Sequence, residues 1–377
     1  MVAEAVSTSR RSPTTRHPWP RRHALVVPQL AMPSYRQEFV RALAESGEDV
    51  LFLVGDRQFG DGVVTDVDSP IVRKTGRNIY LMGRKLVWQP GCLMLGFLAR
   101  NLVIELNPRN LTSWLLLISR LLTFRQASAW GHAHSRRGSR PEFNRPRRFM
   151  QGLCSELITY TETEAAELKA CFPDKPVTPA RNSLYSSAQL SAYAIRDIAR
   201  CTDLIMIGRL VADKKPLLGL AAFEQALPQL PDQASLHVVG AGPQEDDVRA
   251  YLSAAGLTDR VRLHGWVSDL AVLAPIFQRC RALLSPGYVG LNVTQALGFG
   301  LPVIYPRDDP HAPEIEALNP TNSIVFDTDD VDQCSGAIVA LYQGDWPFDS
   351  QRMADEVRSQ YSTERMIQPF VALARRS

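Results

Sequence analysis

The sequence lacks the features that mark disulfide-bonded secreted domains and membrane-spanning proteins. Its 377 residues include six cysteines, which are widely scattered and form no Cys-x-x-Cys pair. Neither a disulfide framework nor a zinc site is therefore indicated, and a reducing compartment is expected. No stretch reaches about 18 uninterrupted apolar residues. Residues 1–22, which we expect to be a disordered tail, lack the apolar core of a signal peptide, so we expect a cytoplasmic protein.

A glycine-rich dinucleotide motif is also missing. Residues 23–28 (HALVVP) predict a buried strand, residues 33–44 a helix, and residues 49–54 a second strand. Strand, helix and strand with short links are typical of a doubly wound α/β domain. No Gly-x-Gly-x-x-Gly follows the first strand, which argues against a dinucleotide-binding dehydrogenase. Residues 56–95 give no clear pattern.

The net charge is only +3, but it is unevenly distributed. Residues 1–200 carry 28 Lys and Arg against 17 Asp and Glu, whereas residues 201–377 carry 14 against 22. This asymmetry suggests two domains with different partners. The basic half suits an anionic acceptor, or peripheral contact with an anionic membrane at its inner face. Nucleic acid is not expected as a partner, because no basic-aromatic nucleic-acid module is present.

Polar residues follow two expected strands of the first half, at the edge where such sheets bind ligands. Asn107 and Arg109 follow the strand at residues 102–106, and we assign them to the acceptor side, with a solvated turn as the equal alternative. His132 follows the strand at residues 127–130. A histidine there can donate to a phosphate or a sugar hydroxyl, although a lone histidine is often structural.

Two other segments of the first half have more than one interpretation. Residues 114–122 (WLLLISRLL) predict a helix, for which a core position is favoured over an interfacial one. A basic run follows, which is either a solvated face or a membrane-docking patch. It consists of Arg136, Arg137, Arg140, Arg145, Arg147 and Arg148. Thr161 and Glu164 have the spacing of a capping box at the start of a helix.

Residues 282–305 (ALLSPGYVGLNVTQALGFGLPVIY) are the most informative stretch of the second half. They predict a buried strand, a break with Pro286 and two glycines, a helix, and a second strand. A helix start after a glycine-rich break offers free backbone N–H groups, which favour an anion. An ordinary βαβ crossover, with glycines for close packing, is the equal alternative.

Two cations lie near the start of a helix earlier in the second half. Arg209 follows the expected strand at residues 203–207, and Lys214-Lys215-Pro216 comes shortly after it. Arg209 as a bidentate donor and Lys215 as a point charge could hold a diphosphate. A further strand at residues 235–239 ends in the bare-backbone loop Gly240–Gly242. The next strand, at residues 261–263, leads into residues 264–267 (HGWV).

Taken in order, GRL–KK, HVVGAGP, VRLHGWV and SPGYVGLNVTQALGFGLPVI resemble the second domain of the retaining glycosyltransferases of family 4, within the glycosyl transferases group 1. The resemblance is clear over about residues 203–341 and weaker over the first domain. It implies the α/β GT-B fold, with two doubly wound Rossmann-like domains facing a central cleft. It also implies that the nucleotide binds to the second domain and the acceptor to the first.

The resemblance also assigns roles to individual residues. Arg209 and Lys215 match the pair that holds the donor diphosphate, and His132 matches a histidine near the transferred sugar. Gly265, Trp266 and Val267 match the loop that contacts the base. The other expected donor-binding residues are Gly240, Gly242, Gly290, Leu291, Asn292, Gln295 and Glu314.

One departure from the family pattern concerns two glutamates, eight positions apart, that many members carry. Gly287 and Gln295 stand at these positions here. Gln295 can still bond a ribose hydroxyl, but Gly287 offers only backbone. Backbone N–H groups of residues 289–292 could meet the phosphate instead, and Glu314 or Glu316 could supply a carboxylate. The Asp-x-Asp pattern at Asp327–Asp330 favours a helix-capping turn over a metal site.

The resulting expectation is a metal-independent, retaining glycosyltransferase (EC 2.4) without a cofactor. It would move a sugar from a UDP- or GDP-sugar to the hydroxyl of a glycan, a lipid-linked or a small-molecule acceptor. The expected divisions are residues 23–187 for the acceptor domain, 188–360 for the donor domain, and 361–377 for a helix returning to the first domain. A non-catalytic partner subunit, an inverting transferase and a sugar-phosphate epimerase are the alternatives.

Overall fold

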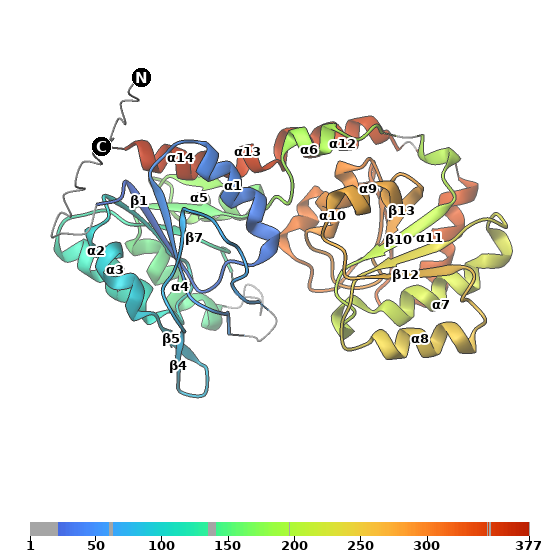
Figure 1. The fold of residues 1–377 in the computed structure, drawn as a ribbon, viewed down its shortest axis with the longest axis horizontal. Coiled ribbons are helices and arrows are strands. Elements are labelled where there is room, and N and C mark those ends of the chain that lie inside the picture. Colours follow the sequence, from blue (N-terminus) through green and yellow to red (C-terminus); the bar gives the residue numbers. More distant parts are fainter. Residues whose placement is uncertain are drawn as a thin grey trace, which may run out of the picture.

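The computed structural model describes residues 22–59, 63–134, 141–195, 197–344, 346 and 348–376. Within them, two parallel sheets form the centres of two domains, drawn at the two sides of Figure 1. The first sheet has the strand order β3-β2-β1-β6-β7-β8-β9. Its strands are β1 (Leu25–Gln29), β2 (Val50–Val54), β3 (Val72–Lys74), β6 (Asn101–Glu105), β7 (Ser128–Trp130), β8 (Glu156–Thr159) and β9 (Val177–Pro179).

Successive residues of a strand point to opposite faces, so a strand that is buried on both sides is apolar throughout. In β1, Leu25 and Val27 enter one core, whereas Val26 enters the other. Helix α1 (Gln37–Glu45) covers the first of these faces. The opposite face packs against α2 (Leu93–Leu98), α3 (Leu111–Leu122), α4 (Pro141–Leu153) and α5 (Glu162–Cys171).

The second sheet has the order β12-β11-β10-β13-β14-β15 and is also covered on both faces. Its strands are β10 (Asp203–Ile207), β11 (Leu236–Val239), β12 (Val261–Gly265), β13 (Cys280–Leu284), β14 (Val303–Pro306) and β15 (Ser323–Phe326). One face packs against α7 (Pro216–Ala226), α8 (Glu245–Ala254) and α11 (Val331–Gln343). The other packs against α6 (Ser187–Ser191), α9 (Leu270–Phe277), α10 (Asn292–Gly298) and α12 (Ser350–Gln360).

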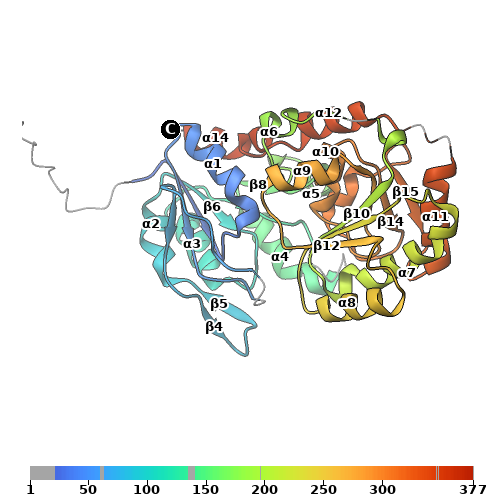
Figure 2. The ribbon, with the colours of Figure 1, turned by 45° about the vertical axis from the view of Figure 1, so that its right-hand side comes forward.

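The strands expected from the sequence are found within one or two residues of their predicted bounds. The segment without a clear pattern, residues 56–95, contains the edge strand β3 and the short antiparallel hairpin of β4 (Ile79–Leu81) and β5 (Leu86–Trp88). This hairpin projects from the first domain in both ribbon views (Figures 1 and 2). Short strands with mixed exposure carry little periodic signal, which explains why the sequence left them open.

Beyond α12 the chain crosses back to the first domain. Helices α13 (Thr363–Met366) and α14 (Gln368–Arg375) pack on the α1 side of the first sheet, and Figures 1 and 2 show this return along one edge of the molecule. The ring of Phe370 lies 5.3 Å from that of Phe39 and 4.9 Å from that of Trp130. None of the helices in the described part of the chain is long and apolar enough to span a bilayer.

Replacing Phe370 with alanine is expected to destabilise the first domain by about 3–5 kcal/mol, because the ring is fully buried between α1 and the sheet. Denaturant unfolding followed by tryptophan fluorescence measures this loss. Gln368→Ala, an exposed position on the same helix, is the control and should change the free energy of unfolding by less than about 0.5 kcal/mol. Equal losses in both variants would show that α14 does not contribute through this ring.

Candidate functional site

The strand order of the second sheet reverses between the neighbouring strands β10 and β13. Ligands bind at such a topological switch point in open α/β sheets. A small cavity lies there, beside the carboxyl ends of the two strands. Its lining includes Gly208, Arg209 and Lys214 from the segment after β10, and Ser285 and Pro286 from the segment after β13. Its volume of about 30 Å³ has room for water only. The site therefore brings two cations, Arg209 and Lys214, to the lining of one small cavity.

Lys214 joins the two segments that frame this cavity. Its ammonium donates to the carbonyl oxygen of Tyr288 at 2.7 Å and lies 4.9 Å from the centre of the Tyr288 ring. Burial lowers the pKa of Lys214 to about 8; Asp213 and Glu314 oppose this shift and Arg209 adds to it. A cation that is partly stripped of water beside a second cation favours an arriving anion.

Lys215, the lysine assigned from the sequence, is held elsewhere. Its ammonium forms ion pairs with Asp309 at 2.8 Å and Asp329 at 2.7 Å, and it is not among the residues that line the cavity. Lys215 caps α7 in the left-handed conformation, with φ at 49°, immediately before Pro216. This left-handed residue turns the backbone, and the side chains of the two neighbouring lysines reach different partners. The structure thus brings Lys214, rather than Lys215, to the cavity with Arg209.

The loops after β10 and β11 touch through their backbones. A Cβ at Gly240 would lie 1.8 Å from the carbonyl oxygen of Gly208, and one at Gly242 would lie 2.3 Å from that of Leu210. Both glycines, which we predicted to bind the donor, are therefore required by contacts within the chain. Beyond β12, the ring of Trp266 is 64% exposed, whereas Val267 packs partly against the core. The loop Gly265–Val267 thus leaves an aromatic face accessible.

The segment after β13 is also held by contacts within the chain. A Cβ at Gly287 would lie 2.4 Å from the carbonyl oxygen of Asp213, which also accepts a hydrogen bond from the Tyr288 N–H. The Val289 N–H is bound by Nδ1 of His311. The Gly290 N–H is bound by the side chain of Asn292. Two of the backbone donors expected to bind phosphate, those of residues 289 and 290, thus already have partners.

Gln295 and Glu314 lie at the boundary between the domains. Gln295 on α10, the helix that Leu291 caps, is buried and donates to the hydroxyl oxygen of Tyr185 at 2.6 Å. Glu314 is buried and accepts from the side-chain amide of Asn182 at 2.9 Å. Glu316 accepts from the backbone N–H groups at the start of α5 and from the Thr163 hydroxyl. Elements that follow the carboxyl ends of β14 and β8 therefore touch, so these edges of the two sheets face each other.

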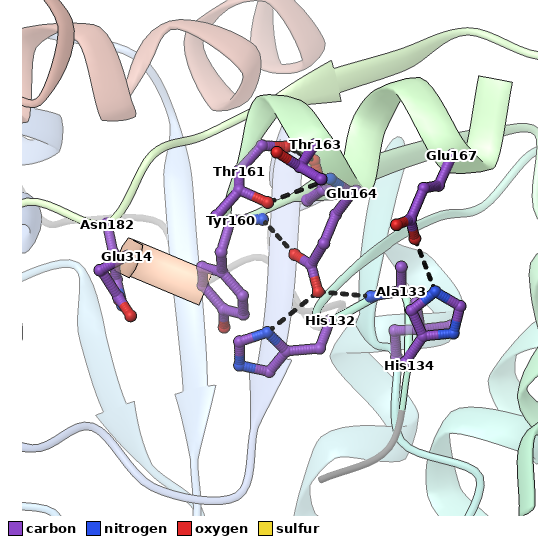
Figure 3. A network of polar contacts seen from close by, with 12 residues as sticks. His132, Ala133, His134, Tyr160, Thr161, Thr163, Glu164, Glu167, Asn182 and Glu314 are labelled. Carbon is purple, nitrogen blue, oxygen red and sulfur yellow. Dashed lines mark hydrogen bonds and ion pairs between the residues drawn. The ribbon is translucent and has the colours of Figure 1, made fainter. Parts of the chain in front are cut away.

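In the first domain, His132 follows β7 and contacts Glu164 on α5 (Figure 3). Its Nδ1 lies 3.3 Å from the carboxylate, which also accepts from the backbone N–H groups of Ala133 and Tyr160. Burial works to raise the pKa of Glu164, but these hydrogen bonds outweigh it and hold the pKa below its ordinary value. The His132 side chain is 43% exposed, so the carboxylate orients an accessible imidazole.

The role of Glu164 was not foreseen beyond its capping-box spacing. The Thr161 half of the box is present, since its hydroxyl accepts from the Glu164 N–H. The glutamate, however, reaches across to the loop after β7. Figure 3 shows Tyr160 between this network and the pair of Asn182 and Glu314. The ring of Tyr160 lies 4.5 Å from that of His132, so the imidazole rests against a half-buried aromatic ring.

The two residues assigned to the acceptor side have partners within the first domain. Asn107 donates to Glu105 and accepts from the backbone N–H of Arg109. The Arg109 guanidinium donates to the carbonyl oxygens of Arg84 and Lys85, and lies 3.5 Å from the centre of the Phe59 ring. Arg109 therefore ties the β4–β5 hairpin to the start of α3.

The basic run is only partly within the described residues. Arg136, Arg137 and Arg140 lie outside them, as do residues 1–21 of the expected tail. Arg145 and Arg148 are exposed on α4, whereas Arg147 donates to the carbonyl oxygens of Leu106 and His132. Of the described residues of this run, Arg145 and Arg148 are thus exposed to solvent, whereas Arg147 holds the loop that carries His132.

The Asp327–Asp330 segment forms a capping turn, as favoured. Asp330 accepts from the Gln333 N–H at the start of α11, and Asp327 contacts Gln333 and Arg307. Among the described residues, no group of three or more His, Cys, Asp or Glu is placed to hold a metal ion.

The segment that contains the cavity between β10 and β13 is similar to known proteins. Residues 201–344 match the family model described as glycosyl transferases group 1. The matched segment is therefore similar to the group 1 glycosyltransferases. The GtfA subunit of the UDP-N-acetylglucosamine–peptide N-acetylglucosaminyltransferase of Streptococcus gordonii is 35% identical over 102 residues. This match covers 27% of the present chain and only 20% of that protein.

Several solved structures match nearly the whole chain. Sucrose-phosphate synthase from Thermosynechococcus elongatus superposes with a TM-score of 0.60 at 16% identity, over 93% of this chain and 98% of that chain. The Anabaena HepE protein in complex with UDP gives 0.62 at 13% identity, over 92% and 98%. The chain therefore has the GT-B fold, as expected from the sequence.

Replacing Gly287 with alanine is expected to destabilise the second domain by about 1–3 kcal/mol, because the added Cβ would press on the Asp213 carbonyl. Gly290→Ala is the matched control in the same segment, since its Cβ would meet its nearest neighbours at 3.6 and 3.7 Å. Chemical denaturation compares the two variants. A Gly287→Ala protein as stable as Gly290→Ala would contradict the backbone packing described here.

Proposed function

We propose that the protein is a glycosyltransferase (EC 2.4) that moves a sugar from a nucleoside-diphosphate sugar to an acceptor hydroxyl. The observation that carries this proposal is the pair of Arg209 and Lys214 at the switch-point cavity. A diphosphate over the mouth of this cavity would meet a guanidinium and an ammonium whose pKa is already lowered to about 8. The group 1 match over the same residues and the UDP bound by the similarly folded HepE protein support it.

The proposed chemistry is largely electrostatic. Arg209 and Lys214 stabilise the negative charge that develops on the leaving diphosphate, so the proposed reaction uses these two side chains and not a metal ion for this purpose. Trp266, which is exposed beyond β12, lies against the base of a UDP- or GDP-sugar. His132, oriented by Glu164, contacts the transferred sugar from the first domain. The proposal includes retention at the anomeric carbon, and a glycan, a lipid-linked or a small-molecule acceptor.

A thermal-shift screen against UDP, GDP and ADP sugars, followed by product analysis with the stabilising donor, tests the proposal. Stabilisation by one donor, together with transfer or hydrolysis that keeps the donor's anomeric configuration by NMR, is the expected result. Stabilisation by no nucleotide would contradict it.

A second candidate is a non-catalytic partner subunit with the same fold. Two observations favour it: Gly287 offers no carboxylate and has no room for one, and the matched GtfA protein is itself named as a subunit. A chain that binds a nucleotide sugar but never turns it over, alone or with acceptors, would select this candidate. The nucleotide-binding step is common to both, so the binding predictions below hold for either.

Lys214→Ala is expected to weaken UDP binding by about ten- to a hundredfold, because a charge-assisted contact to phosphate is lost. Lys215→Ala is the matched control on the adjacent residue and should change the affinity by less than about threefold, since its ammonium is held by Asp309 and Asp329. Isothermal titration calorimetry measures both. A larger loss of UDP affinity for Lys215→Ala than for Lys214→Ala would assign the diphosphate contact to Lys215 instead.

UDP affinity is expected to fall as the pH rises through about 8, the pKa of Lys214. A bound diphosphate favours the ammonium and raises this pKa, so binding above pH 8 takes up a proton. At about pH 9 the affinity should be up to about tenfold lower than at about pH 7.

Titrations in buffers of different ionisation enthalpy measure this proton uptake. The variant Lys214→Arg, whose guanidinium stays protonated, should lose the pH dependence. If UDP affinity still depends on pH in Lys214→Arg, the titrating group is a residue other than Lys214.

A further inference from the structure

Helices α2 and α3 present an apolar surface on the outside of the first domain. Six large side chains contribute to it, with exposed fractions from 43% for Phe97 to 98% for Phe124. A hollow of about 460 Å³ between the two helices is lined almost entirely by apolar side chains. We call this surface the α2–α3 apolar face, and define it by Met94, Phe97, Leu115, Ile118, Leu122 and Phe124.

The apolar side chains of this face do not contribute to the core of the first domain. The inner side of α3 is already filled, since Leu116 and Leu117 are buried. The buried Arg120 guanidinium donates to the carbonyl oxygens of Gly96, Ala99 and Arg100 at the end of α2. The outer residues at positions 115, 118 and 122 follow helical spacing on the opposite side. Helix α3 is thus apolar on two sides, only one of which is covered.

Phe124 is the most exposed member of the face. Its φ is 53°, a left-handed conformation that bulky residues rarely adopt. The next residue, Arg125, fixes this turn by donating to the carbonyl oxygens of Phe97 and Ala99. The fold therefore holds an aromatic ring in solvent at the end of α3, in an unfavourable backbone conformation.

The charges of these elements indicate what covers the face. Between Asp68 and Glu142 the sequence has 12 Lys and Arg but a single carboxylate, Glu105. Glu105 accepts hydrogen bonds from the Leu30 N–H and from Asn107, so it is engaged within the domain. Exposed cations of this segment include Arg100 beside α2 and Lys85 on the hairpin. An apolar protein partner does not require the absence of carboxylates, whereas an anionic bilayer repels them.

We propose that the α2–α3 apolar face docks on an anionic lipid membrane. The apolar side chains would enter the boundary between headgroups and acyl chains, while the surrounding Lys and Arg meet the anionic headgroups. Figures 1 and 2 place α2 and α3 on the side of the first domain away from the second domain. Docking there leaves the edge that faces the second domain free. This inference stands on the surface itself and does not rest on the proposed transfer reaction.

Vesicle flotation with the full chain tests the proposal. The probes are vesicles of phosphatidylcholine alone and vesicles that also contain phosphatidylglycerol. The test variant combines Leu122→Ser with Phe124→Asn, because both side chains are exposed and asparagine tolerates the left-handed conformation. Val272→Ser is the control, since Val272 is a 50% exposed apolar residue on α9 of the second domain. Circular dichroism and thermal unfolding verify that both variants fold.

The wild-type chain should float with phosphatidylglycerol vesicles, bind phosphatidylcholine vesicles only weakly, and dissociate as salt is raised. The double variant should bind at least about tenfold more weakly, and Val272→Ser should bind like the wild type. Unchanged binding of the double variant would overturn the proposal. Absence of binding to anionic vesicles would also overturn it. If the wild type then self-associates in sedimentation and the double variant does not, the face is an interface between copies.

Discussion

The backbone contacts at the carboxyl edge of the second sheet are the constraint on which the site depends. Gly240 lies against the carbonyl of Gly208, and Gly287 against that of Asp213. Larger residues at these glycines would separate the loops after β10, β11 and β13. Their contact leaves no room for side chains at these glycines, and the charged groups that line the cavity are those of Arg209 and Lys214. Lys214 has given up part of its hydration on folding, which prepares it for an anion.

The same region is linked to the first domain through carboxylates. Glu314 acts electrostatically on Lys214 and accepts a hydrogen bond from Asn182, next to the crossing between domains. Glu316, two residues later, accepts from the first N–H groups of α5, where a negative charge is favourable. The helix that carries Glu164, and thereby orients His132, is thus contacted directly by the domain that carries the cations. These contacts between the two halves of the site are polar, and run from Glu314 and Glu316 to Asn182 and the start of α5.

Most of the fold, apart from residues 56–95, could be predicted from the sequence because both sheets are buried on two faces. Their strands are apolar runs, such as residues 203–207, that need no partner to be recognised. The site was harder to predict, because it depends on contacts through space. Lys214 and Lys215 are neighbours with the same chemistry, and only the left-handed turn before Pro216 separates their directions. The contact of Glu164 with the loop after β7 joins residues 32 positions apart, which no local pattern reveals.

The path of the backbone has a mechanical consequence. The chain passes from the first domain to the second between β9 and β10, and returns between α12 and α13. Both of these covalent connections lie along one edge of the molecule (Figures 1 and 2). A single connection would attach the second domain to the first at one point, whereas these two attach it at two points along that edge. A change in the separation of the two domains would therefore involve the backbone of both connections, not of one alone.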